Sequence, residues 1–430
     1  MNKRKTLPYD ETVQCVQCGY CLPACPTYLT MKRETHSPRG RINLVQMAAE
    51  GHLSLDELEE PLDLCLGCRA CETACPSGVQ YGKILEDARG VLAEYKGNRT
   101  STPLRWIEDK MFQNIFPSPK KLQLLTDVIW LYQASGVQAM VHKGKLNHVL
   151  SDNLRAFEAV LPKVSSPLKR RKRPRLFKPP IANTLQWKVA FFTGCIMDAI
   201  FEKINRLSME LLALAGCEVH VIGEQTCCGA LHAHAGRLDD AKILAKRNIE
   251  AFERLDVDFI VNNAGGCGGM LVEYDHLFHD DPQWEERAKA FVAKTRDISQ
   301  VLAQCELPLT KPVNEIITYQ RSCHMTNVQK VTTEPLDLIK RIPGVTFREM
   351  ANPDMCCGSA GIYNVLNYKE SMEILDVKME TVKETTATTI VTTNPGCLLQ
   401  MKLGVQREGL SERVRVVHLA ELLAESAELL

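Results

Sequence analysis

Two cysteine runs near the start of the chain share one spacing. Residues 15–26 and 65–76 both follow C-x2-C-x2-C-x3-C-P, the spacing with which bacterial ferredoxins hold [4Fe–4S] clusters. The first three cysteines of such a run bind one cluster, and the fourth, before the proline, binds the cluster of the other run. Structural zinc or disulfides give no reason for a repeated Cys-Pro. The pattern therefore predicts two clusters.

This crosswise pattern assigns all eight cysteines. The predicted ligands are Cys15, Cys18, Cys21 and Cys75 for the first cluster, and Cys65, Cys68, Cys71 and Cys25 for the second. Between the runs, Ser37 and Pro38 predict the start of a helix. Arg39 and Arg41 on that helix are expected near the clusters, where a cation raises the reduction potential, or else on a solvated helix start.

Composition favours an intracellular redox protein. A length of 430 residues predicts two or three domains. The chain has 18 cysteines but begins with a polar segment instead of a signal peptide, so the thiols are expected in a reducing compartment, serving metal or redox chemistry. A net charge of +0 argues against nucleic acid as a partner. No apolar run approaches the roughly 20 residues that span a bilayer. The expected location is the cytoplasm, with peripheral contact to the inner face of the cell membrane.

The chain divides into five segments by composition and motif. We expect a mostly helical, ferredoxin-like domain over residues 1–95, a helical segment over 96–161 and a basic, proline-rich linker over 162–187, followed by two related domains over 188–312 and 313–430. The basic linker is expected to be extended and solvated. Contact with an anionic membrane surface is the alternative role for it.

The last two segments are tandem copies of one α/β unit. Each contains a Cys-Cys-Gly triplet, and successive cysteine landmarks are 32 and 40 residues apart in one copy and 33 and 41 in the other. Strands are predicted at 189–193, 218–222, 259–262, 316–319, 345–350 and 389–392. Because helices alternate with these strands, we expect mostly parallel sheets with cysteine loops at the carboxyl ends of the strands. The overall fold class is thus multidomain, α+β and α/β.

Each copy offers four cysteines as candidate metal ligands. They are Cys195, Cys227, Cys228 and Cys267 in the first copy, and Cys323, Cys356, Cys357 and Cys397 in the second. Four thiolates suit an iron–sulfur cluster or a zinc ion, and one copy can also have lost its cofactor. Two cysteines remain, Cys217 and Cys305, and these are expected to be packing residues. Three histidines, His232, His234 and His324, lie near the cysteine loops in sequence.

The two C…CCG…C copies resemble the cysteine-rich (CCG) domains of heterodisulfide reductase and its relatives. That pattern ends in CxxC, whereas Ala264 and Asn394 stand here in place of the first cysteine of the pair, which argues against a five-cysteine, non-cubane cluster. The whole order of modules resembles the iron–sulfur subunit family of glycolate oxidase. The motifs that carry this resemblance are residues 25–28, 37–41, 65–79, 227–231 and 356–361.

The resemblance implies an electron-transfer subunit of an oxidoreductase complex. A separate FAD-binding flavoprotein would oxidise the 2-hydroxy acid, and this chain would pass the electrons to a quinone or other acceptor. The sequence agrees, because no G-x-G-x-x-G follows a strand and no catalytic residue is predicted. Gly265–Gly269 is glycine-rich, but its central cysteine argues against a phosphate loop. The alternatives are the iron–sulfur subunit of anaerobic glycerol-3-phosphate dehydrogenase and a CCG-type thiol/disulfide reductase.

Overall fold

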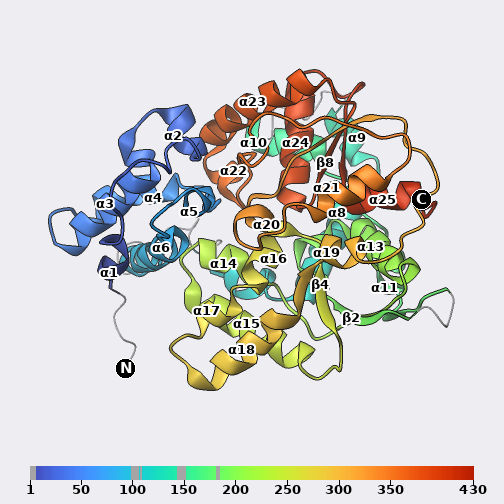
Figure 1. Cartoon of the computed structure of the whole chain (residues 1–430), viewed down its shortest axis with the longest axis horizontal. Helices are drawn as coiled ribbons and strands as arrows, with labels where there is room; N and C mark the ends of the chain where they lie inside the picture. Colours follow the sequence, from blue (N-terminus) through green and yellow to red (C-terminus); the bar gives the residue numbers. More distant parts are fainter. Residues whose placement is uncertain (1–5, 98–105, 107–108, 143–151, 181–184) are drawn as a thin grey trace.

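The computed structural model describes residues 6–97, 106, 109–142, 152–180 and 185–430. The N-terminal helices form a module at one side of the molecule, drawn in blue in Figure 1. The two α/β copies lie beside it, the first in green to gold and the second in orange to red. A small helical module is therefore set against a larger body that contains two sheets.

The N-terminal module is helical and has its own core. Its elements are α1 (Tyr9–Thr12), α2 (Pro26–Met31), η1 (Glu34–His36), α3 (Pro38–Ala49), α4 (Leu55–Asp63), α5 (Ala70–Thr73) and α6 (Tyr81–Gly97). As predicted, α3 begins after Ser37, whose side chain accepts a hydrogen bond from the backbone N–H of Gly40. Leu58, Ile84 and Ala88 belong to the buried core of the module.

The segment after this module is helical in its described residues. Its elements are η2 (Met111–Ile115), α8 (Pro119–Ala134), α9 (Val137–His142) and α10 (Asp152–Val160). Phe112, Phe116 and Leu122 form a buried cluster with Ala199 of the first α/β copy. The helical segment thus covers part of that copy.

Residues 162–187 are more structured than an extended, solvated linker. They contain a short helix, α11 (Pro167–Arg171), and a strand, β1 (Leu176–Phe177), which pairs antiparallel with a strand of the first copy. Arg170 is buried and forms an ion pair with Asp127 of α8, and Arg173 forms one with Asp198. Carboxylates distant in sequence meet these basic side chains, so the charges hold the segment against its neighbours.

The first α/β copy builds a five-stranded sheet. Its elements are β2 (Trp187–Phe191), α12 (Ile196–Ala199), α13 (Glu202–Leu214), β3 (Cys217–Val221), α14 (Ala230–His234), α15 (Leu238–Phe252), β4 (Phe259–Asn262), α16 (Gly265–Leu271), α17 (Tyr274–Leu277), α18 (Pro282–Lys294), β5 (Thr295–Asp297) and α19 (Ile298–Ala303). The strand order is β1-β3-β2-β4-β5, and all neighbours are parallel except β1 and β3.

The second copy builds a four-stranded parallel sheet. Its elements are β6 (Ile316–Tyr319), α20 (Cys323–Asn327), α21 (Glu334–Arg341), β7 (Thr346–Phe347), α22 (Tyr363–Leu366), α23 (Tyr368–Thr385), β8 (Thr389–Thr392), α24 (Pro395–Arg407), β9 (Arg415–His418) and α25 (Leu419–Ser426). Its order, β7-β6-β8-β9, repeats the β3-β2-β4-β5 order of the first sheet. This agreement in topology matches the duplication that the cysteine intervals predict.

The two copies share one buried core. Phe191 and Val261 of the first sheet belong to the same apolar cluster as Ile317 and Ile390 of the second. His418, at the end of β9, also hydrogen-bonds the Asn263 carbonyl oxygen of the first copy through Nε2, at 2.9 Å. The copies therefore form one body, which fixes the cysteine loops of one copy relative to those of the other.

The glycine-rich segment 265–269 serves this contact between the copies. It forms most of α16, which packs against α20. A Cβ atom at Gly265 would overlap the Ser322 Oγ, and one at Gly269 would lie 3.0 Å from the His324 Cβ. Only glycine allows the two helices to approach this closely. Helix packing therefore explains these glycines, and a phosphate loop is not needed to account for them.

Candidate metal centres

Two cavities in the N-terminal module are lined by cysteines. The first is lined by Cys15, Cys18, Cys21 and Cys75, together with Cys71 and Arg39. Cys18 is exposed and the other three of the predicted set are partly exposed, so this cavity lies near the molecular surface. The structure therefore brings together the four thiols that the spacing groups as the first ligand set, although Cys75 is far from the others in sequence.

The second cavity lies deeper in the molecule. It is lined by Cys25, Cys65, Cys68 and Cys71, and Arg41 lies beside them. Cys25, Cys65 and Cys71 are buried. These four thiols are the second ligand set that the crosswise spacing groups. The depth of this cavity would shield a bound cluster from water more strongly than the first cavity does.

Arg41 places a buried positive charge next to the second cavity. Its side chain is 1% exposed and donates hydrogen bonds to the Pro61 carbonyl oxygen at 2.6 Å and to the Thr27 hydroxyl. Neither of these two acceptors is a carboxylate. A buried guanidinium needs negative charge nearby, and thiolates around a bound anionic cluster would supply it.

The electrostatics of Cys65 agree with this role for the arginine. Burial opposes ionisation of the thiol, but Arg41 and Arg89 outweigh it and lower the pKa of Cys65 below its usual range. The backbone N–H of Gly67 donates to the Cys65 sulfur at 3.4 Å, and the Tyr81 hydroxyl donates at 3.3 Å. Hydrogen bonds to ligand sulfur help to set the reduction potential of a cluster. The donor set and its surroundings therefore fit an iron–sulfur cluster.

The cysteines of the first α/β copy lie together at the carboxyl edge of its sheet. The sulfur atoms of Cys195 and Cys227 are 3.4 Å apart, and Cys228 contacts Cys267. Gly229, which completes the triplet, has φ of +92°, a conformation that other residues rarely adopt. The hydrogen bond with Cys227 and burial raise the pKa of Cys195, so this thiol stays protonated unless a metal replaces the proton.

The second copy repeats this arrangement. Cys323 contacts Cys356, and Cys357 contacts Cys397. Gly358 has φ of +90°, and a Cβ atom there would lie 2.8 Å from the Ser371 carbonyl oxygen. Hydrogen bonding with Cys356 and burial raise the pKa of Cys323. The four candidate cysteines of each copy are thus close to one another.

Lys378 distinguishes the second copy from the first. This lysine is fully buried, and its ammonium donates hydrogen bonds to the carbonyl oxygens of Asn352 and Pro353. Burial lowers the pKa of Lys378 to about 8, although the Cys357 and Cys356 thiolates oppose the shift. A buried cation beside one cysteine set is compatible with a negatively charged metal centre there.

The two positions that lack the expected cysteine have other contacts. Ala264 is 2% exposed and belongs to the shared apolar core. Asn394 accepts a hydrogen bond from the Gly266 backbone N–H at 3.0 Å and donates to the Cys397 sulfur at 3.7 Å. Asn394 therefore joins the two copies at the edge where their cysteines lie.

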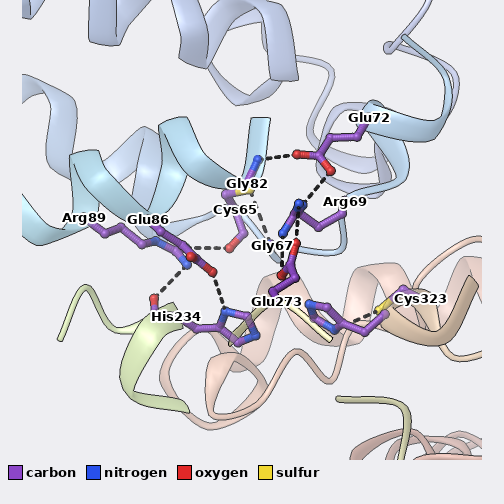
Figure 2. A network of polar contacts seen from close by, with 11 residues as sticks. Cys65, Gly67, Arg69, Glu72, Gly82, Glu86, Arg89, His234, Glu273 and Cys323 are labelled. Carbon is purple, nitrogen blue, oxygen red and sulfur yellow. Dashed lines mark hydrogen bonds and ion pairs between the residues drawn. The ribbon is translucent and has the colours of Figure 1, made fainter. Parts of the chain in front are cut away.

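Two of the three candidate histidines meet between the copies. The rings of His234 and His324 stack with centroids 5.1 Å apart, and His234 also contacts Glu86 of α6, as Figure 2 shows. Burial lowers the pKa of His324 to about 3, so its imidazole is neutral. His232 instead hydrogen-bonds the Phe112 carbonyl oxygen through Nε2. Within the described ranges, no group of three or more His, Cys, Asp or Glu side chains is arranged to hold a single metal ion.

The second cavity of the helical module adjoins the cysteine set of the second copy. Cys68 and Cys323 pack against one buried cluster that contains Leu66, Cys356 and Tyr363. The two thiols are close enough for Cys323 to raise the pKa of Cys68 further, in addition to burial. This proximity joins two cysteine sets that the sequence treats as separate modules, and no sequence pattern indicates it.

Arg69 anchors the helical module to the first copy. Its guanidinium binds both carboxylate oxygens of Glu273, at 3.1 and 2.9 Å, and also binds Glu72 (Figure 2). Arg69 itself has φ of +61°, which turns the chain between the second and the third cysteine of the run. The Glu72 carboxylate accepts a further hydrogen bond from the Gly82 N–H. The bidentate ion pair fixes the module on the body.

Three family models match the chain in the order of these modules. A 4Fe-4S dicluster domain matches residues 11–79, the linker region of the glycolate oxidase iron-sulfur subunit matches 103–161, and a cysteine-rich domain matches 189–272 and again 317–402. No helix in the described part of the chain has the length and apolar character to cross a membrane.

Individual relatives extend the likeness over the whole chain. The probable glycolate oxidase iron-sulfur subunit of Bacillus subtilis is 50% identical over 431 residues, which cover 99% of this chain and 96% of the relative. The glycolate oxidase iron-sulfur subunit of Escherichia coli is 29% identical over 89% of this chain and 88% of its own. Lactate utilization protein A of Halalkalibacterium halodurans is 36% identical over 55% of this chain and 96% of its own.

The fold and the cysteine sets define an iron–sulfur protein in which a 4Fe-4S dicluster domain precedes two cysteine-rich domains. Within that class, the chain belongs to the family of glycolate oxidase iron–sulfur subunits. The first and second α/β copies are accordingly called CCG1 and CCG2 below.

Proposed function

We propose that this chain is the electron-transfer subunit of a membrane-linked 2-hydroxy-acid dehydrogenase, with glycolate as the substrate. A partner flavoprotein would oxidise the substrate, and this chain would carry the electrons to a quinone or another acceptor. The observation that supports this most directly is the proximity of Cys68 to Cys323, because it joins the dicluster module to CCG2 without a break. The names of the relatives from B. subtilis and E. coli support the choice of substrate.

The lining of the two cavities supports the ligand sets predicted from the cysteine spacing. We assign Cys15, Cys18, Cys21 and Cys75 to a first [4Fe–4S] cluster, and Cys25, Cys65, Cys68 and Cys71 to a second. Each cluster, when bound, supplies one-electron transfer at its position. The chain holds the thiolates, excludes water from the second cavity and places Arg41 there to offset negative charge. Further metal centres, iron–sulfur or zinc, are proposed at the four-cysteine sets of CCG1 and CCG2, where a single zinc ion would require the thiols to move from the arrangement described above.

The geometry also suggests an order for the sites. The first cavity is near the surface, the second is buried next to it, and CCG2 adjoins the second. CCG1 follows through the contact of α16, which carries Cys267, with α20, which begins at Cys323. We therefore propose the sequence first cluster, second cluster, CCG2, CCG1 along the molecule, with the direction of flow set by where the flavoprotein docks.

Lactate is a second candidate substrate for the complex. The relatives named lactate utilization protein A match 55% of this chain at 34–36% identity. Lactate is also a 2-hydroxy acid, so the chemistry on the flavoprotein would be the same. The choice between the two acids rests with the partner, because the described residues include no pocket that we assign to a substrate.

The test is reduction of the intact complex by substrate. The chain should be purified anaerobically with its flavoprotein, mixed with glycolate or lactate, and followed by EPR and by flavin absorbance. We expect flavin reduction to be followed by cluster signals from this chain. A complex in which the flavin is reduced and reoxidised by the acceptor at full rate while the clusters stay oxidised would contradict the proposed route.

A further inference from the structure

Helix α8 is held to the body along one face. Leu122 and Thr126 on that face are buried, and Asp127 beside them forms ion pairs with Arg170 and Arg171 of α11. Near the end of the helix, the Gln133 side chain accepts a hydrogen bond from the Val164 backbone N–H at 2.9 Å. These contacts fix the rotation of α8 about its axis.

The opposite face of α8 is apolar and exposed. Leu124, Leu125, Val128 and Leu131 expose 66%, 46%, 59% and 60% of their surface in the part of the chain that the structure describes. Val128 and Leu131 follow Leu124 by four and seven residues, so these side chains form one stripe along the helix. The four residues are called the α8 apolar face.

Cations lie at the N-terminal end of this face and on the neighbouring basic segment. Lys120 and Lys121 lie in the first turn of α8 and are exposed. Lys169 and Lys172 of the neighbouring basic segment are also exposed. Because Asp127 is paired with two arginines, the exposed charged side chains of α8 are Lys120 and Lys121, which place positive charge at the N-terminal end of the face. An apolar stripe next to exposed lysines is the pattern of a helix that lies in the interface of an anionic bilayer.

We propose that the α8 apolar face, with the lysines next to it, docks this protein on an anionic lipid surface. The choice of lipid over a protein partner rests on charge complementarity and on the form of the face, which is a narrow stripe along a single helix. Exposed apolar patches on proteins mark interaction sites. The stripe inserts its leucines below the headgroups while the lysines contact lipid phosphates.

The position of α8 gives this contact a consequence for electron transfer. Helix α8 packs on α12, which directly follows Cys195 of CCG1, and Cys195 itself packs against the buried Phe112 cluster of the helical segment. Docking through α8 would therefore place CCG1, the last site in the proposed order, nearest the membrane. This inference rests on the proposed function and deepens it, but vesicle binding is measured without turnover, so the two can fail separately.

Vesicle co-sedimentation of the cluster-loaded full chain tests the proposal. The probes are vesicles of phosphatidylcholine alone and of phosphatidylcholine mixed with phosphatidylglycerol. We expect binding to the mixed vesicles only, and a loss of at least about ten-fold in apparent affinity for the double variant Leu124→Glu, Val128→Glu. Lys120→Glu with Lys121→Glu should weaken binding on the order of ten-fold and reduce its dependence on salt.

The matched control is Ile243→Glu on α15, since Ile243 is 51% exposed on another element. It should bind vesicles like the unmodified chain, and all variants should retain their iron content and their activity with a soluble acceptor. The proposal is overturned if the unmodified chain does not bind anionic vesicles, or if Ile243→Glu loses as much binding as the α8 variants. It is also overturned if the α8 variants bind vesicles normally but lose the flavoprotein or change oligomeric state, because the face would then be a protein interface.

Discussion

The side-chain amide of Asn327 donates a 3.0 Å hydrogen bond to the backbone carbonyl oxygen of Cys68. The amide oxygen of the same residue accepts a hydrogen bond from the Thr73 hydroxyl at 2.9 Å. Asn327 thus ends α20 of CCG2 and holds the second cysteine run of the helical module at both ends of α5. This side chain therefore helps to fix the distance between two of the proposed redox sites.

Removing this bridge should slow electron transfer between the two modules. We expect Asn327→Leu to keep its iron but to lose hydrogen bonds worth about 1 kcal/mol each, which loosens the contact between Cys68 and Cys323. Rapid-freeze EPR should then show normal reduction of the dicluster module and slower electron exchange with CCG2. Lys330→Met, at a nearby exposed contact to Thr73, is the control, and an equal effect from it would remove Asn327 from this role.

Cys21→Ser should disable the first cluster while leaving the flavin reaction intact. A serine hydroxyl is far less acidic than a thiol and a poor ligand for iron, so iron content should fall by up to about four atoms from the roughly eight expected for two clusters. Stopped-flow reduction of the partner flavin by substrate should stay near normal, while turnover with an external acceptor should collapse. Cys305→Ser, at a buried thiol outside the ligand sets, should change neither quantity. If flavin reduction and turnover fall equally in Cys21→Ser, the first cluster does not act only after the flavin, and the proposed role of this chain is contradicted.

Arg41 should raise the reduction potential of the second cluster. Its buried charge favours the more negative, reduced state, so Arg41→Met should lower the midpoint potential of that cluster on the order of 50–100 mV. Arg41→Lys keeps the charge and should restore most of the difference. An EPR-monitored redox titration measures both. If the two variants shift the potential equally, the hydrogen bonds of the guanidinium matter and its charge does not.

Serine in either Cys-Cys-Gly triplet should remove metal from that copy alone. In Cys228→Ser and Cys357→Ser, one of four proposed ligands is lost, and bound metal contributes directly to the stability of its domain. We expect a fall in metal content and a lower melting temperature in both. If these cysteines are core thiols only, each change should cost roughly 1–2 kcal/mol with metal content unchanged. That outcome, together with full turnover, would make the CCG domains docking surfaces for the flavoprotein.

His418 should make the contact between CCG1 and CCG2 sensitive to acid. Burial lowers the pKa of His418 to about 4, from 6.5. Between these values the unfolded chain binds a proton that the folded protein does not, so this contribution to stability is complete above pH 6.5 and is lost as the pH falls toward 4, by at most about 1.4 kcal/mol per pH unit. Melting temperatures at roughly pH 7.5 and pH 5 measure this loss.

A variant that cannot titrate separates His418 from other acid-sensitive groups. His418→Asn should show a smaller decrease in melting temperature on acidification than the unmodified chain. Its melting temperature at neutral pH should be lower, because the hydrogen bond to the Asn263 carbonyl oxygen is weakened or lost. His279→Asn, at an exposed position, should behave like the unmodified chain. The assignment fails if both variants respond to pH in the same way.

Much of the organisation of the α/β copies could be predicted from the sequence. Three predicted strands, at 259–262, 316–319 and 389–392, have the observed bounds, because each is a short run rich in β-branched and aromatic residues. Strands β5 and β9 were missed. Their sequences, Thr-Arg-Asp and Arg-Val-Val-His, are short and partly polar, and each leads directly into a helix. Edge positions in a sheet allow such strands.

The basic segment is harder to predict for a different reason. Its charge and prolines suggest an extended, solvated linker, but its carboxylate partners Asp127 and Asp198 lie 43 and 25 residues away from the arginines that bind them. No local pattern reports such pairings. The same holds for Cys68 and Cys323, whose proximity depends on how the helical module sits on CCG2. Spacing predicts how the ligands group, whereas the relation between the groups requires the fold.

Asn394 occupies a position where two demands compete. As an amide it accepts from Gly266 of the other copy, next to the hydrogen bond between the Gly265 N–H and the Thr393 carbonyl oxygen. A cysteine at this position would restore a CxxC pair in CCG2, but the 3.0 Å hydrogen bond from the Gly266 N–H would be lost. Introducing a fifth cysteine into CCG2 would therefore weaken the contact between the two copies. A change in cluster type would thus also require a different interface between the repeats.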